Sequence, residues 1–189
     1  MRLFLPYRRQ FYFYVDIPRL IRRVHLPQSD PEAVHPALLN AIYLIACHLV
    51  KGELTRYQPI LLARARAYMD ESLAHVDRLT HFLSASLILS CWYEQSGRLV
   101  EAQYVNHLDI GLHISNTLTD PRRSSIATTV QFAVACGLHD PNNNSASVVI
   151  PTAEGVELID RRNLWYGITM CDNCLSFGNG TPRVAPEKV

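Results

Sequence analysis

The sequence predicts an all-α domain, a bundle-like assembly of about six helices. Apolar residues recur at three- and four-residue intervals through most of the chain, which is the spacing of one helix face. Proline and glycine stand at the ends of these segments, as is typical of helix starts and stops. The β-branched run "SVVI" has no partner strand and is followed at once by Pro151. Helices packed on helices therefore explain the pattern better than a sheet does.

Residues 1–35 are expected to form an irregular, aromatic and Pro-rich lead-in, with a short helix near 18–24. The helical domain itself is expected to span 36–189. Pro36 suits the first position of its first helix, and Gly52 suits the stop just after it. The expected helices cover residues 36–50, 59–77, 80–96, 98–112, 125–136 and 157–177.

The later helices carry boundary signals of the same kind. Pro59 suits the start of the second helix and Thr80 the cap of the third, while Gly97 and Gly137 follow the ends of the third and fifth. The last helix has apolar residues on one stripe. These are Leu164, Ile168, Cys171 and Leu175.

The centres of the most apolar helices predict core side chains at Leu44, Trp92 and Trp165. Arg66 falls mostly on the polar side of the second helix and is expected at the surface. Truncating any of the three core residues to alanine is expected to cost about 2–5 kcal/mol, and truncating Arg66 very little.

Composition fits one folded domain and excludes some functions. The chain has 189 residues, 48% of them hydrophobic, so it is long enough to bury a sizeable core. Its net charge of +1 gives no basic face for autonomous binding to DNA. The most apolar run, 36–50, is shorter than a bilayer span and contains Asn40 and His48, which favours a buried helix and no membrane association. Five cysteines, mostly within apolar helical patterns, indicate reduced thiols.

Cys171 and Cys174 form the one Cys-x-x-Cys of the sequence. A structural zinc site needs four ligands, and no second pair accompanies this one. A thioredoxin-like site needs its first cysteine at a helix N-terminus, whereas both thiols fall inside the predicted last helix. We therefore expect Cys171 in the core and Cys174 on its flank, with no metal and no other cofactor bound by this chain.

No motif of a known catalytic site is present, and the sequence predicts no enzyme. Its eight histidines lack the His-Glu-x-x-His spacing, and neither a Gly-x-Ser-x-Gly nor a phosphate-binding Gly-rich loop occurs. Asp172 is the one carboxylate inside a largely apolar helix, so it needs a partner. We expect a structural salt bridge to an arginine such as Arg98 or Arg161; a catalytic carboxylate is the alternative.

Five phrases, in order, resemble the fungal-specific transcription factor domain, the middle homology region of activators that carry a binuclear zinc cluster. "HPALLNAIYLIACHLV" and "ARAYMDESL" resemble its first two core helices, "SASLILSCWYEQSGRLVEAQY" its helix-Gly-Arg-helix hairpin, and "AVACGLHD" the next helix end. "DRRNLWYGITMCDNCLSFGNGTP" resembles its Arg-Arg, Trp, Asp and Gly-x-Pro block. The resemblance covers most of residues 4–187. Its motif positions are Gly97, Arg98, Glu101, Arg161, Arg162, Trp165, Asp172, Gly180 and Pro182.

This resemblance implies a non-catalytic regulatory domain in the nucleus, which acts on RNA polymerase II transcription through effector sensing, autoinhibition or coregulator contact. The implied partners are other parts of the transcription factor, coregulators and a small-molecule effector. DNA contact and zinc would belong to a separate module, whose six-cysteine cluster this sequence lacks. We expect the chain to hold the N-terminal part of the domain and to be incomplete at its C-terminal end. The alternatives are a stand-alone helical enzyme or small-molecule-binding domain, and a degenerate protein without activity.

Residues 105–126 have no counterpart in the resembled family. Gly111 and Asp120-Pro121 interrupt the helical pattern there, and "SNTLT" has low helix propensity. Three origins would explain the segment: a loop insertion, a functional lid, or non-coding sequence that is translated. The last is favoured, because the sequences on either side of the segment would match the family pattern if they were joined directly. Deleting 106–126 is then expected to leave stability unchanged or raised.

Overall fold

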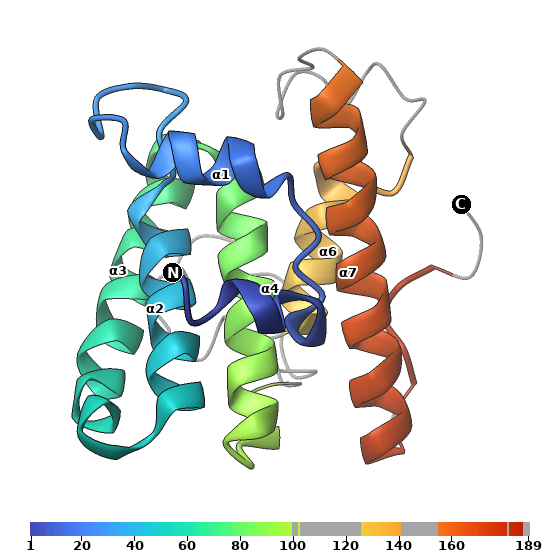
Figure 1. Cartoon of the computed structure of the whole chain (residues 1–189). Helices are drawn as coiled ribbons and strands as arrows, with labels where there is room; N and C mark the ends of the chain where they lie inside the picture. Colours follow the sequence, from blue (N-terminus) through green and yellow to red (C-terminus); the bar gives the residue numbers. More distant parts are fainter. Residues whose placement is uncertain (100–101, 103–125, 141–154, 181, 187–189) are drawn as a thin grey trace.

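The computed structural model describes residues 1–99, 102, 126–140, 155–180 and 182–186, with the backbone alone at 155–158 and 179 (Figure 1). Within these residues every regular element is a helix, and the all-α prediction is confirmed. The α-helices are α1 (Ile17–Val24), α2 (Pro36–Val50), α3 (Gln58–His75), α4 (Leu79–Gln95), α6 (Ile126–Ala135) and α7 (Gly155–Asn179). Two 3₁₀ helices, η1 (Leu5–Phe11) and η2 (Gly52–Tyr57), accompany them. Most of the predicted helix 98–112, nearly all of 105–126 and the "SVVI" run lie outside the described residues.

The proline and glycine signals placed the helix boundaries to within about two residues. Thr80, expected to cap the third helix, instead lies within the first turn of α4, whose start has no side-chain cap. Pro36 opens α2, and the His35 ring caps that helix by accepting the Ala37 N–H at 3.2 Å. Gly52 follows its end with φ +68°, a left-handed conformation that suits glycine. The short helix expected near 18–24 is α1, capped by the Asp16 carboxylate, which accepts the Arg19 N–H at 2.9 Å.

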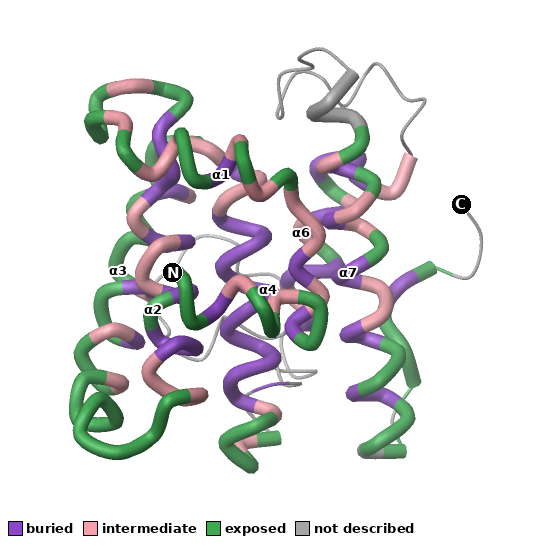
Figure 2. Tube along the Cα trace, in the orientation of Figure 1, coloured by how far each residue is buried: buried purple, intermediate pink, exposed green. Residues whose placement is uncertain are grey.

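α4 is the central helix of the domain. It packs against α2 and α3 on one side and against α6 and α7 on the other (Figure 1). Every residue from Phe82 to Tyr93 is buried, as Figure 2 shows for its middle turns. Its buried serines are satisfied by hydrogen bonds: Ser90 donates to the Ser86 carbonyl at 3.0 Å, and the Ser86 hydroxyl lies 2.5 Å from that of Thr129.

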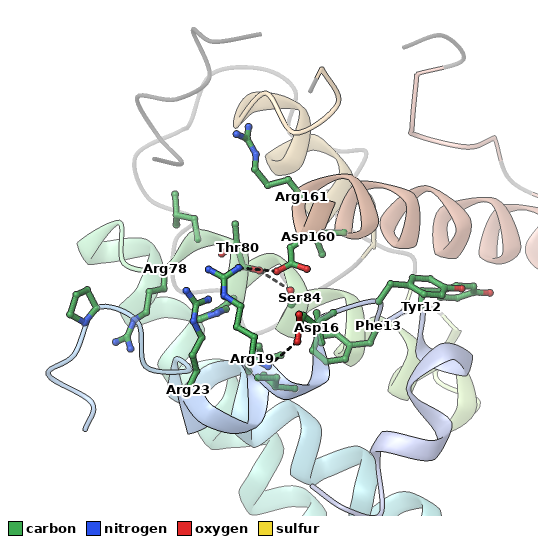
Figure 3. Close-up of a pocket in the computed structure, with 18 of the residues that line it drawn as sticks. Tyr12, Phe13, Asp16, Arg19, Arg23, Arg78, Thr80, Ser84, Asp160 and Arg161 are labelled. Atoms are coloured by element: carbon green, nitrogen blue, oxygen red, sulfur yellow. Dashed lines mark hydrogen bonds and ion pairs between the residues drawn. The ribbon is translucent and has the colours of Figure 1, made fainter. Parts of the chain in front are cut away.

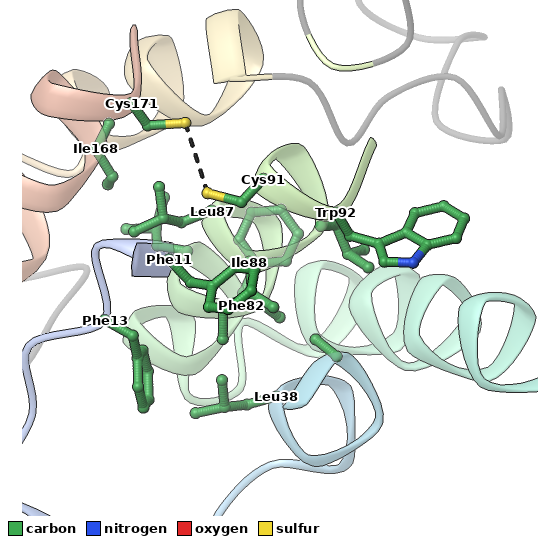
Figure 4. Packing of buried hydrophobic residues seen from close by; sticks show 14 of the residues in the cluster. Phe11, Phe13, Leu38, Phe82, Leu87, Ile88, Cys91, Trp92, Ile168 and Cys171 are labelled. Carbon is green, nitrogen blue, oxygen red and sulfur yellow. Dashed lines mark hydrogen bonds between the residues drawn. The ribbon is translucent and has the colours of Figure 1, made fainter. Parts of the chain in front are cut away.

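The first residues of the chain belong to this core. The irregular segment expected before α1 instead contains η1, which packs against α4. Phe4, Phe11 and Phe13 are at most 2% exposed, and the rings of Phe11 and Phe13 lie 5.8 and 5.6 Å from that of Phe4. Figure 4 shows Phe11 and Phe13 in the same cluster as Leu87 and Ile88 of α4. Aromatic burial at the N-terminus therefore closes one side of the bundle.

Two of the predicted core and surface positions need correction. Leu44 and Trp92 are buried, as expected, but Trp165 is only half-buried and lies edge-on to His139 at 6.2 Å between ring centroids. Arg66 is not a free surface residue: it donates a hydrogen bond to the buried Tyr93 hydroxyl, and its guanidinium lies 5.6 Å from that ring. The hydrophobic pattern alone could not show this contact between α3 and α4.

Candidate functional site

A pocket of about 380 Å³ lies where α1, residues 12–16, the start of α4 and the first half of α7 meet (Figure 3). Its volume falls in the range of small-molecule sites. Its apolar wall includes five phenylalanine and leucine side chains from five parts of the chain. These are Phe13, Leu20, Leu38, Leu79 and Leu164.

The polar side of the pocket begins on α1. Arg19 and Arg23 are four residues apart and therefore share one helix face. Both line the pocket, and in Figure 3 their guanidinium groups extend from α1 toward Thr80 on α4. Arg19 is 3.4 Å from the Asp160 carboxylate of α7, and Arg23 is 3.7 Å from the mostly exposed Glu32 carboxylate. These contacts hold the two arginines at the pocket.

Asp160 lies in a half-buried position on α7. Burial is the main cause that raises the pKa of its carboxyl, and neighbouring Asp16 adds to it; Arg19 and Arg23 act in the opposite direction. The two carboxylates and two guanidinium groups thus form a mixed-charge rim that connects α1 with α7.

Arg78 precedes α4 in a left-handed conformation, with φ 45°. Its guanidinium group binds the Asp77 carboxylate at 2.7–3.0 Å and the Ala33 carbonyl at 3.0 Å. These contacts fix Arg78 beside the pocket, and the Asp77 carboxylate offsets much of its charge. The side chains of Thr80 and His81, in the first turn of α4, complete the lining.

His81 presents a neutral ring to the pocket. Its Nδ1 accepts the His35 N–H at 3.3 Å, so in the neutral ring the proton sits on Nε2. Burial lowers the pKa of His81 to about 3, and the charges of Arg23 and Arg78 contribute to this shift. At neutral pH the ring therefore offers an Nε2–H donor.

Hydrogen-bond donors outnumber acceptors in this lining. The lining holds four arginines, His81, Thr80 and Ser84 as donors, against two carboxylates, Asp16 and Asp160. In Figure 3 the Arg161 side chain points away from Thr80 and Asp160. The Ser84 hydroxyl donates to the Thr80 carbonyl at 2.8 Å, so it is not paired with the His81 ring as a nucleophile–base dyad would require. The arrangement is suited to holding a ligand.

The predicted motif residues do not converge on one site. Of those described, only Arg161 lines the pocket; it is 8% exposed, whereas its neighbour Arg162 is exposed. Gly180, with φ +65°, follows the end of α7, and Pro182 beyond it is exposed. Half-buried Trp165 packs at the edge of the core, and Glu101 lies outside the described residues.

Gly97 and Arg98 have a structural role at the end of α4. Gly97 has φ +72° and donates to the Glu94 carbonyl at 3.0 Å, and the Arg98 N–H donates to the Tyr93 carbonyl at 2.8 Å. This is the Schellman pattern of hydrogen bonds. It places the Arg98 guanidinium 5.0 and 5.8 Å from the ring centroids of Tyr93 and Trp92.

The buried carboxylate of Asp172 has a partner other than the expected arginine. It accepts the backbone N–H groups of Val184 and Ala185, both at 2.9 Å. Arg98 stacks on the aromatic rings at the end of α4, and Arg161 lines the pocket. The expectation of an arginine salt bridge was therefore wrong: the segment that follows α7 folds back onto Asp172.

The predicted placement of the two cysteines, one in the core and one on its flank, is confirmed. Cys171 is fully buried with its sulfur 3.8 Å from that of Cys91, as Figure 4 shows, and Cys174 is exposed, 3.1 Å from the Tyr12 hydroxyl. In the part of the chain that the structure describes, no three His, Cys, Asp or Glu residues are grouped to hold a metal ion.

Sequence reasoning missed the pocket. One local signal was present: "DIPRLIRR" places Asp16 at a helix N-cap and Arg19 and Arg23 on one face of the helix. The approach of Asp160 and the first turn of α4 to that face depends on the tertiary fold and has no local signal.

Comparison with protein-family models, with curated proteins and with solved structures gave no match. Among the described helices, none combines the length and the apolar character needed to cross a membrane.

Proposed function

We propose that this chain is a ligand-sensing regulatory module of a nuclear fungal transcription factor, and that it has no catalytic activity. The observation that carries the proposal is the pocket, which joins α1, α4 and α7 around a donor-rich lining. The ordered motifs that resemble the fungal transcription factor domain support the regulatory setting. Of the modes of regulation implied by that resemblance, the pocket favours effector sensing.

A ligand in this pocket would contact helices that are far apart in the sequence. Binding would add contacts between α1, the start of α4 and α7, and would stabilise the arrangement in which these helices meet. In the proposed function this change alters how the module engages a coregulator or another part of the same transcription factor. Recognition of DNA, with its zinc, belongs to a separate module.

The hydrogen bonding of the polar residues in the pocket supports a non-catalytic role. The Ser84 hydroxyl is engaged with a carbonyl of its own helix, and Nδ1 of His81 is engaged with the His35 backbone. Both groups are thus held as parts of the wall and are not aligned with each other for proton transfer.

A reporter assay tests this proposal. The full chain is inserted between a heterologous DNA-binding module and an activation domain in a fungal host, and reporter output is compared with that of the fusion without the chain. We expect the chain to change the output. Thr80→Trp, which fills the pocket, is expected to change it further, whereas Thr55→Trp on exposed η2 is not. Identical output with and without the chain would contradict the proposal.

The same pocket also fits a helical small-molecule-binding domain that works alone. The two functions differ in the reporter assay: a stand-alone binding domain would bind ligand in solution and leave reporter output unchanged.

A further inference from the structure

We infer that the pocket binds a small apolar organic acid as a monoanion, with its carboxylate held between Arg19 and Arg23 of α1 and the first turn of α4. The inference rests on the proposed function, because it names the class of effector for the same pocket.

The donors come from two opposite sides. Arg19 and Arg23 share one face of α1, and each guanidinium has a planar set of N–H groups that matches the two oxygens of a carboxylate. Across the cavity, Thr80 supplies a hydroxyl and His81 its Nε2–H. A carboxylate between these sides could accept from both.

The backbone of α4 adds to this preference. α4 is 17 residues long, has no side-chain cap at its start, and presents its first-turn residues Leu79, Thr80 and His81 to the pocket. The N-terminal end of a helix carries partial positive charge. The lowered pKa of His81 agrees, because after burial its causes are led by Arg23 and Arg78, while Asp77 opposes them more weakly.

The carboxylates around the pocket limit the charge of the ligand. Asp77 offsets Arg78, Glu32 lies near Arg23, and Asp16 and Asp160 line the rim itself. The excess of positive charge is therefore small. A phosphate dianion or a polyanion would be repelled strongly by the two rim aspartates, whereas the single charge of one carboxylate can be offset by the two guanidinium groups.

The remaining wall requires an apolar body. Phe13, Leu20 and Leu164 line the cavity along with Leu38 and Leu79, and all five are buried in the core cluster. An inorganic anion would leave this surface without a partner, whereas an aromatic or alkyl group would cover it.

The test uses the full chain and matched pairs of probes. Benzoate, 1-naphthoate and decanoate are each compared with the uncharged amide of the same skeleton, and inorganic phosphate is the anion without an apolar body. Binding is measured by isothermal titration calorimetry and by the thermal midpoint. We expect at least one acid to bind and to raise the midpoint, and its amide to bind roughly tenfold or more weakly, since a charge-assisted contact is lost.

Arg23→Gln is expected to weaken binding of that acid roughly tenfold or more. Arg22→Gln is the matched control, because Arg22 is the exposed neighbour on α1 outside the pocket. Circular dichroism checks that each variant is folded. Should Arg23→Gln not fold, Arg19→Gln removes the second guanidinium from the same face and is expected to weaken binding in the same way.

The outcomes separate the inference from the proposed function. Equal binding of acid and amide, or equal weakening by Arg22→Gln, would overturn the carboxylate inference and leave ligand sensing standing. If phosphate bound as tightly as the acids, the inference that the ligand has an apolar body would be overturned. No binding by any probe would overturn the inference, and an unchanged reporter would then also end the proposed function. Binding of the acid with no effect on the reporter would support the inference and contradict the regulatory proposal.

Discussion

At the scale of single residues, Asp172 shows how a buried charge is held by backbone alone. It is 1% exposed and accepts two N–H groups from the segment after α7. Carboxylates that accept backbone hydrogen bonds need no cationic partner, because the amide dipoles stabilise the negative charge. Asp172 therefore anchors the end of the described chain to the core, next to buried Ala185.

Replacing Asp172 with alanine is expected to lower the free energy of unfolding by about 1–3 kcal/mol, because two backbone donors lose their acceptor. Urea denaturation measures the change. Asp172→Asn, which keeps one acceptor oxygen, should recover part of the loss. Exposed Asn173→Ala is the adjacent control and should have little effect. Equal losses for Asp172→Ala and Asn173→Ala would contradict the anchoring role.

Arg66 provides a second test at this scale. It contacts both the hydroxyl and the ring face of Tyr93, which is 1% exposed. Arg66→Ala should therefore destabilise the fold by about 1–2 kcal/mol, through a buried hydroxyl left unpaired and a lost cation–π contact. Arg64→Ala, on the exposed face of the same helix, should stay within about 0.5 kcal/mol of the parent. Similar midpoints for both variants in thermal melts would show that the Tyr93 contact adds nothing.

At the scale of elements, the N-terminal segment depends on one glycine of α7. A Cβ built on Gly167 would lie 2.5 Å from the Tyr12 carbonyl oxygen and 3.2 Å from a Leu87 methyl group. The absence of a side chain lets residues 12–16 pass close to α7, and these residues form one edge of the pocket. The glycine thus sets the distance between α7 and residues 12–16, the segment that leads into α1.

Gly167→Ala should destabilise the protein by about 1–3 kcal/mol, because the backbone of residue 12 must move to admit a methyl group. Gly178 lies in the same helix with nothing within 4 Å of its built Cβ. Gly178→Ala is therefore expected to stabilise α7 slightly, by up to about 1 kcal/mol. The two variants are compared by chemical denaturation. A gain of stability in both would show that the passage of residue 12 is not tight.

The elements themselves were predictable because their signals are local. Pro36, Gly52 and Gly97 act within one turn of the helix ends they mark, so the ends of α2 and α4 followed from sequence. η1 was missed because its stability comes from burying Phe4 and Phe11 against other helices. The partner of Asp172 was missed for the same reason: it lies beyond the end of α7, where no periodicity applies.

At the scale of the whole molecule, the pocket is the place where chain segments with no local relation to one another meet. Composition indicated one folded domain, and the cluster of buried residues indeed joins the N-terminal phenylalanines to Ile168 and Leu175 of α7. The candidate site could not be predicted from sequence. Its charged groups form one site only because the tertiary fold brings α1, the start of α4 and Asp160 together.

Two histidines beside this pocket should make the stability of the whole domain depend on pH. Burial lowers the pKa of His81 to about 3, and lowers that of His35 as well. Beside burial, Arg23, Arg78 and His35 lower the pKa of His81, and Asp77 raises it. For His35, Arg78 lowers the pKa, and Asp77 and Glu71 raise it. In the unfolded chain both histidines regain a pKa near 6.5. Below that pH the unfolded state binds protons that the folded state does not.

The stability contributed by neutral His81 is therefore fully present above pH 6.5 and falls as the pH is lowered from 6.5 toward about 3. The slope is up to about 1.4 kcal/mol per pH unit for one histidine. Asp77, whose pKa is lowered, loses its contribution only below its ordinary value of 3.8, outside a pH 7–5 window. Urea denaturation between pH 7 and pH 5 should show the parent losing stability and His81→Gln losing less. Exposed His75→Gln should keep the slope of the parent. Parallel pH profiles for the parent and His81→Gln would mean that this ring is not held neutral at the pocket.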